Sequence, residues 1–95
     1  MEEVIFKLVD GSGGFYILNE GEQLGEMKIS IREDILTVYH TEVLPKAEGH
    51  GLATKLLKAM VDYARQHKLK VLPLCPYVLV QFRRHSDEYA DIWKR

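Results

Sequence analysis

The chain has 95 residues, 46% of them hydrophobic and 28% charged, with a formal net charge of −1. This length predicts one domain over residues 1–95, because independent cores usually need about 50 to 200 residues. A nearly neutral chain lacks the positive excess of nucleic-acid-binding proteins, and no apolar run reaches the roughly 20 residues of a membrane helix. The scattered histidines and the single cysteine predict no metal and no internal disulfide. The acidic start lacks a secretory signal, so we expect a cytoplasmic protein.

The first half of the sequence predicts four antiparallel strands. They are Val4–Val9, Phe15–Asn19, Leu24–Ile31 and Ile35–Val43, separated by glycine-bearing or charged turns. The last of them is the longest and is rich in β-branched and aromatic residues. Because side chains alternate along a strand, the even positions from Leu36 to Glu42 are expected to share one face.

The second half changes to a helical pattern. Apolar residues recur at helical spacing between His50 and Lys68. A short strand is predicted at Lys70–Leu74, and Pro76 favours the start of a helix that runs to about His85. A final short helix is predicted over Glu88–Lys94. The order is therefore ββββ-α-β-α(α), an α/β (α+β) fold with a mixed, mostly antiparallel sheet.

The most informative segment is Val43–Thr54, where a strand passes through a glycine-bearing loop into the long helix. Such a junction leaves backbone N–H groups unpaired and adds the positive end of the helix dipole, an arrangement that favours phosphate. Gly49 and Gly51 would let an anion approach the main chain. The Gly-Lys-Ser/Thr of a P-loop is absent, and the loop does not follow the first strand as a dinucleotide fingerprint would. Taken alone, the two glycines are equally compatible with ordinary turn and capping chemistry.

The segment resembles the acetyl-CoA signature of the GCN5-related N-acetyltransferase (GNAT) superfamily, Gln/Arg-x-x-Gly-x-Gly/Ala. That frame here reads Lys46-Ala47-Glu48-Gly49-His50-Gly51. Further matches to a branch of very small GNAT-like proteins are His40-Thr41-Glu42-Val43, Gly51-Leu52-Ala53, Pro73-Leu74-Cys75-Pro76-Tyr77-Val78, and Arg84-His85 with Glu88-Tyr89. The resemblance covers essentially the whole chain in order. It implies a minimal GNAT fold and acetyl transfer from acetyl-CoA to an amine acceptor.

The resemblance also implies where acetyl-CoA lies, in the notch between the fourth and fifth strands. The implied cofactor-binding residues are Val43, Leu44, Pro45, Lys46, Glu48, Gly49, His50, Gly51, Leu52, Ala53 and Thr54. The diphosphate would lie on the N–H groups of Gly49–Thr54, and the pantetheine would pair like an extra strand near Val43 and Pro45. Lys46 stands where Gln or Arg is usual, and Glu48 stands where a basic residue is common. A carboxylate at that position is expected to weaken diphosphate binding.

Three residues are candidates for handling the proton of the acceptor amine. His40 and Glu42 precede the loop, on the strand that supplies a carboxylate base in many GNATs. Cys75 would lie near the thioester at a helix start, where thiolates are stabilised. Each has a structural alternative: a solvated strand position for Glu42, a hydrogen-bonded half-buried position for His40, and a buried apolar position for Cys75. Tyr77 is expected in the core.

The acceptor side is expected to be open, because only a turn joins the first two strands where larger relatives insert helices. An open side favours a large acceptor, such as a protein or peptide amine. Two other interpretations remain: a CoA-binding or protein-interaction module without catalysis, and a structural domain without a ligand.

Overall fold

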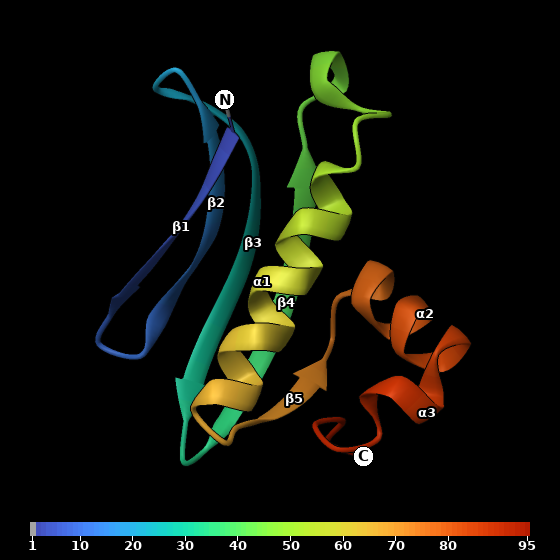
Figure 1. Ribbon diagram of the computed structural model, residues 1–95. Helices are drawn as coiled ribbons and strands as arrows, with labels where there is room; N and C mark the ends of the chain where they lie inside the picture. Colours follow the sequence, from blue (N-terminus) through green and yellow to red (C-terminus); the bar gives the residue numbers. More distant parts are fainter. Residues whose placement is uncertain (1) are drawn as a thin grey trace.

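The computed structural model describes residues 2–95 and confirms the predicted order of strands and helices (Figure 1). In chain order the elements are β1 (Glu2–Val9), β2 (Ser12–Asn19), β3 (Glu22–Arg32), β4 (Ile35–Val43), the 3₁₀ helix η1 (Pro45–Ala47), α1 (Leu52–Gln66), β5 (Lys70–Pro73), α2 (Pro76–Arg84) and α3 (Ser86–Tyr89). None of the helices in residues 2–95 is long and apolar enough to cross a membrane.

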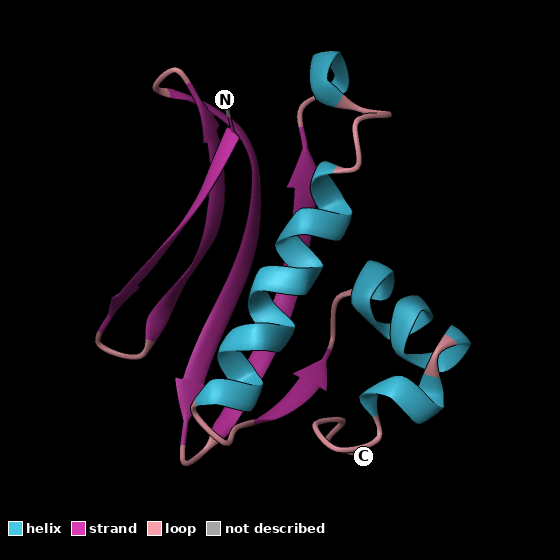
Figure 2. Ribbon diagram, in the orientation of Figure 1, coloured by secondary structure: helices cyan, strands magenta, loops and turns pink. Residues whose placement is uncertain are grey.

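The sheet keeps its strands in the order β1-β2-β3-β4-β5. Neighbours from β1 to β4 are antiparallel, and β5 is parallel to β4. A parallel neighbour needs a crossover connection, which α1 supplies by running back along β4 (Figures 1 and 2). The end of β4 and the start of α1 therefore lie at the same end of the sheet, beyond the ends of the strands. Ligands of open α/β sheets commonly bind there.

The core is formed where α1 packs on one face of the sheet. The buried positions of the helix are Leu52, Leu56, Leu57, Met60, Val61 and Ala64, which follow helical spacing. Opposite them the sheet buries Ile17, Met27, Ile29, Leu36 and Val38. Full burial of a side chain of this size is worth about 1.5–3 kcal/mol, so this interface makes a large contribution to stability.

A second apolar group holds α2 and α3 beside β5. The fully buried Phe82 ring stacks on Tyr89 with their centroids 4.7 Å apart, and it meets Trp93 edge-on at 5.7 Å. Burial raises the pKa of the Tyr89 phenol.

The predicted final short helix is present, but its predicted bounds, Glu88–Lys94, are wrong, since α3 covers Ser86–Tyr89. The chain beyond it returns to the free edge of β5. The N–H of Val71 donates to the carbonyl of Ile92 (2.6 Å), and the N–H of Lys94 donates to the carbonyl of Val71 (2.8 Å). These bonds satisfy backbone groups of an edge strand that would otherwise be exposed.

A β-bulge interrupts the pairing of β3 with β4. Val38 of β4 lies opposite Ile29 of β3, and His40 lies opposite Lys28, the residue that precedes Ile29. Tyr39 is therefore the extra residue of the bulge, and the side-chain alternation of β4 shifts by one position there.

This shift corrects the expectation that the even positions from Leu36 to Glu42 share one face. Beyond the bulge, Thr41 lies opposite the fully buried Met27, on the side of the sheet that α1 covers. His40 and Glu42 are exposed and lie on the other face of β4. A period-two pattern cannot reveal an inserted residue when both neighbouring side chains are polar.

Candidate functional site

β4 and β5 are paired at one end and separate at the other. Pairing covers Ile35 to Val38 of β4, and the last link is a hydrogen bond from the N–H of Cys75 to the carbonyl of Val38 (2.9 Å). The chain then enters α2 at Pro76, whereas β4 continues through Tyr39–Val43. Within residues 2–95, no strand pairs with this part of β4 on the β5 side. An extended ligand could therefore add to it as a strand.

The loop between β4 and α1 lies next to this open edge. Gly49 and Gly51 have φ values of 86° and 74°, and nothing lies within 4 Å of the position that a Cβ would take at either residue. Backbone conformation, and not crowding, is thus the reason for glycine here. Gly51 is the N-cap of α1 and no side chain caps the helix. The first N–H groups of α1 are available to an anion, with the positive end of the helix dipole behind them.

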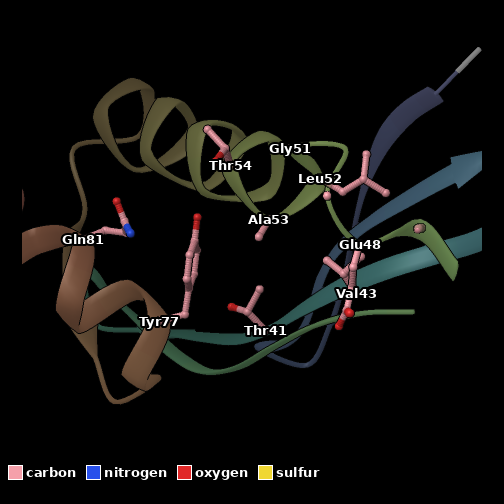
Figure 3. Close-up of a pocket in the computed structure, with 11 residues that line it drawn as sticks. Thr41, Val43, Glu48, Gly51, Leu52, Ala53, Thr54, Tyr77 and Gln81 are labelled. Atoms are coloured by element: carbon pink, nitrogen blue, oxygen red, sulfur yellow. The ribbon is translucent and has the colours of Figure 1, made fainter. Parts of the chain in front are cut away.

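A cleft of about 430 Å³ joins the open edge of β4, the loop, α1 and α2 (Figure 3). Its lining residues are Thr41, Val43, Ala47, Glu48, Gly49, Gly51, Leu52, Ala53, Thr54, Tyr77 and Gln81. In Figure 3, Tyr77 and Gln81 of α2 face Ala53 and Thr54 of α1, and Thr41 of β4 lies below Ala53 in this view. The volume falls within the range of small-molecule sites, roughly 300–1,000 Å³. Walls of mixed apolar and polar residues, with a helix N-terminus at one end, suit an elongated molecule that carries phosphate.

The cleft includes most, but not all, of the predicted cofactor residues. Those that line it are Val43, Glu48, Gly49, Gly51, Leu52, Ala53 and Thr54; those that do not are Leu44, Pro45, Lys46 and His50. Lys46 and His50 line a separate depression of about 290 Å³, together with Glu22 of β3. The side chain of Glu48 is exposed at the cleft, so the expectation that this carboxylate weakens phosphate binding stays a prediction.

Cys75 lies where β4 and β5 part, and its side chain is buried, with 2% of the residue exposed. Its Sγ is 3.3 Å from Oγ1 of Thr41. Cys75 is also the N-cap of α2, as the sequence predicts, although its side chain makes no capping bond. The cleft reaches Thr41 but not the thiol.

His40 and Glu42 lie on the opposite face of β4 from Thr41, and neither lines the cleft. Their side chains are about half exposed or more, and Nε2 of the imidazole is 3.5 Å from the carboxylate Oε1. Glu26 of β3 joins them: the three potential ligand atoms lie within 4.8 Å of one another. No other such trio is found in residues 2–95. Gln23 donates to Oε1 of Glu26 at 3.2 Å. Sequence spacing missed this group because Glu26 comes from another strand.

Four lining residues were not predicted for the cleft: Thr41, Ala47, Tyr77 and Gln81. Thr41 is turned toward it by the bulge, and Tyr77, expected in the core, packs against the core and lines the cleft as well. Tyr77 and Gln81 are one helical turn apart on α2, which places them on one face. That i, i+4 pair next to Pro76 is a signal from which the sequence could have predicted this wall.

Comparison with known proteins shows which family and fold this chain resembles. The model of the GCN5-related N-acetyl-transferase family matches residues 14–92. A candidate GCN5-like N-acetyltransferase from Staphylococcus aureus has 28% identity and a TM-score of 0.69, over 95% of this chain and 87% of that one. A candidate acetyl transferase from Pyrococcus furiosus has 28% identity and a TM-score of 0.63, over 78% of this chain and 58% of that one.

A more distant match shares the fold. AAC(6')-Iy, solved in complex with the bisubstrate analog CoA-S-monomethyl-acetylneamine, has 18% identity and a TM-score of 0.59, over 92% of this chain. This chain spans 65% of AAC(6')-Iy and 42% of the ribosomal-protein-S18-alanine N-acetyltransferase of Escherichia coli, less than two thirds of each. No curated protein sequence matches this chain.

Proposed function

Because this chain belongs to the GCN5-related N-acetyl-transferase (GNAT) family, we propose that it transfers the acetyl group of acetyl-CoA to an amine acceptor. The observation that carries the proposal is the meeting of three features in one cleft: the open edge of β4, the left-handed glycine loop and the uncapped start of α1. AAC(6')-Iy, which shares the fold, has been solved with a ligand that contains CoA.

In this proposal the cleft holds the cofactor along its length. The N–H groups of Gly49–Thr54 bind the diphosphate, since they belong to the loop and first turn of a helix start that no side chain caps. The free edge beside Thr41 and Val43 pairs with the pantetheine as a strand would. Tyr77 and Gln81 close the other side of the cleft.

Within this proposal, the burial of Cys75 favours direct transfer over an acetyl-enzyme intermediate. The amine nitrogen attacks the thioester carbonyl carbon, the C–S bond breaks, CoA leaves as a thiolate, and a base accepts the proton of the amine. Free backbone N–H groups where the strands part stabilise the oxyanion. His40 or Glu42 accepts the proton, so the acceptor approaches from the face of β4 opposite the cofactor. An acetyl-Cys75 intermediate would require exposure of a thiol that is 2% exposed.

The acceptor class follows from the exposed side of this arrangement. His40 and Glu42 are exposed to solvent, and a large acceptor can reach them without entering an enclosed pocket. We therefore propose a protein or peptide amine as the acceptor. The compartment proposed with it is the cytoplasm.

The binding step is tested by isothermal titration with acetyl-CoA. Gly51→Glu places a carboxylate at the proposed phosphate site and should abolish micromolar binding. Gly21→Glu is the matched control, because Gly21 also has a positive φ (85°) and open space around it but lies in the β2–β3 turn. Circular dichroism checks that both variants fold. Absence of binding to the unaltered protein up to millimolar acetyl-CoA would overturn the proposal.

A second candidate is a CoA-binding or protein-interaction module without catalysis. The burial of Cys75, and the placement of His40 and Glu42 outside the cleft, favour it. Mass spectrometry of acetylated products, with a panel of amines and peptides, separates the two candidates. Turnover that falls with Glu42→Gln supports the enzyme, whereas acetyl-CoA binding without any acetylated product supports the module.

A further inference from the structure

We infer that Lys46 positions the cofactor loop and does not bind the cofactor phosphates; the inference rests on the function proposed above. Lys46 occupies the first position of the signature, where the resemblance implies a phosphate contact. The structure gives this side chain another partner. Nζ of Lys46 forms an ion pair and hydrogen bond with Glu22 of β3, 24 residues away in the sequence.

The Lys46–Glu22 pair lies on the side of the loop that faces away from the cleft. Both residues line the 290 Å³ depression, and neither lines the 430 Å³ cleft. Glu48, two residues further along, lines the cleft, so the loop has one lysine directed to the sheet and one carboxylate directed to the ligand space.

The loop is attached to β3 by two neighbouring contacts. The N–H of Leu44 donates to the carbonyl of Leu24 (2.9 Å), and Lys46 reaches Glu22 on the same strand. By contrast, Gly49 and Gly51 have no neighbours within 4 Å of a Cβ position. The position of these glycines, and hence of the N–H groups that follow, depends on how the first part of the loop is held.

The second lysine near the start of α1 is also paired with the sheet. Lys55 forms an ion pair with Glu2 of β1, and this hydrogen bond lowers the pKa of the Glu2 carboxyl. Two cations near the loop are therefore neutralised by carboxylates of the sheet. The attraction for a diphosphate must then come chiefly from the main chain and the helix dipole.

The sign of the effect of Glu22→Gln on acetyl-CoA affinity tests the inference. If Lys46 positions the loop, loss of its partner loosens the loop and weakens binding by about two- to fivefold, the range expected for an exposed ion pair. If Lys46 is a phosphate ligand held back by Glu22, the same change frees it and tightens binding. Glu20→Gln is the matched control for long-range charge, because it removes a carboxylate two residues before Glu22, in the β2–β3 turn, for which no ion pair is found within residues 2–95. The inference would be overturned if Glu22→Gln bound acetyl-CoA more tightly than the unaltered protein, or if its affinity equalled that of Glu20→Gln.

A double-mutant cycle provides a second readout. Lys46→Gln should weaken binding as much as Glu22→Gln, and the double variant should be no weaker than either single variant, because both remove one interaction. Lys46→Arg keeps the pair and should retain the affinity. If the losses of binding free energy in the two single variants added up in the double variant, the two residues would not share one interaction.

Hydrogen exchange of the free protein separates this inference from the proposed function. The hydrogen-bonded amides of the loop, those of Leu44, Ala47 and Glu48, should exchange faster in Glu22→Gln and in Lys46→Gln, but not in Glu20→Gln, even without acetyl-CoA. Faster exchange in a protein that does not bind acetyl-CoA would disprove the proposed function alone. Unchanged exchange in a protein that binds acetyl-CoA would disprove the positioning role alone.

Discussion

The two ends of α1 are built in opposite ways. At its start, Gly51 leaves the helix uncapped beside a cleft, and the loop before it has glycines with positive φ. At its far end, Arg65 donates to both carboxylate oxygens of Asp91 (3.0 and 3.2 Å), and Lys70 donates to the backbone carbonyl of Asp91 (2.6 Å). At the far end of α1, charged side chains are hydrogen-bonded within the chain. At its start, the backbone N–H groups are left available to a ligand.

This difference separates stability from binding along one helix. Substitutions at the closed end should change the free energy of unfolding without affecting acetyl-CoA affinity. Substitutions at the open end should change affinity more than stability, because the groups concerned make few contacts within the protein. The following predictions test that separation, beginning with the largest effect.

Phe82→Ala should destabilise the protein most, by about 3–5 kcal/mol. The ring is fully buried and contacts Tyr89 and Trp93, so its loss leaves a cavity under the segment that closes the far end of α1. Denaturant unfolding followed by circular dichroism measures the change. A loss below about 1 kcal/mol would show that this aromatic group can be rearranged at little cost.

Gly51→Ala should cost about 1–2 kcal/mol of stability, because a Cβ is unfavourable at its φ of 74°. Acetyl-CoA affinity should also fall, since any relaxation of the strain moves the first N–H groups of α1. Unfolding curves and calorimetric titration measure the two effects. Unchanged affinity in a destabilised protein would mean that the loop does not hold the ligand.

Arg65→Ala should cost at most about 1 kcal/mol, because the pair with Asp91 is partly exposed. Affinity for acetyl-CoA should not change. Lys58→Ala is a suitable control, since Lys58 pairs with Asp62 at i, i+4 on the exposed face of the same helix and should cost less. A drop in affinity for Arg65→Ala would show that the two ends of α1 are coupled.

The smallest effect concerns pH. The hydrogen bond from Arg65 holds the pKa of the Asp91 carboxyl below its usual range, so the charged form stabilises the fold. This contribution is present above the unfolded pKa of about 3.9 and is lost as the pH falls through the lower folded value. The stability difference between the unaltered protein and Asp91→Asn should therefore shrink below about pH 4. A difference that stays constant down to pH 2 would rule out this role of the carboxylate.

Local patterns in the sequence were sufficient for the order of the elements and for the position of the loop. Alternation and helical spacing predicted the order of strands and helices, because each period is a property of neighbouring residues. The strand–glycine–helix junction likewise predicted the segment that borders the cleft, from Val43 to Thr54. The functions of these residues remain proposals.

Pairing between distant residues was decided by the tertiary structure alone. The bulge at Tyr39 places Thr41 and not His40 toward the cleft, and it arises from the register of β4 against β3. The partner of Lys46 comes from β3, and so does Glu26, which lies beside His40 and Glu42. Each of these outcomes depends on contacts between segments far apart in the chain, which a period of 2 or 3.6 residues does not encode.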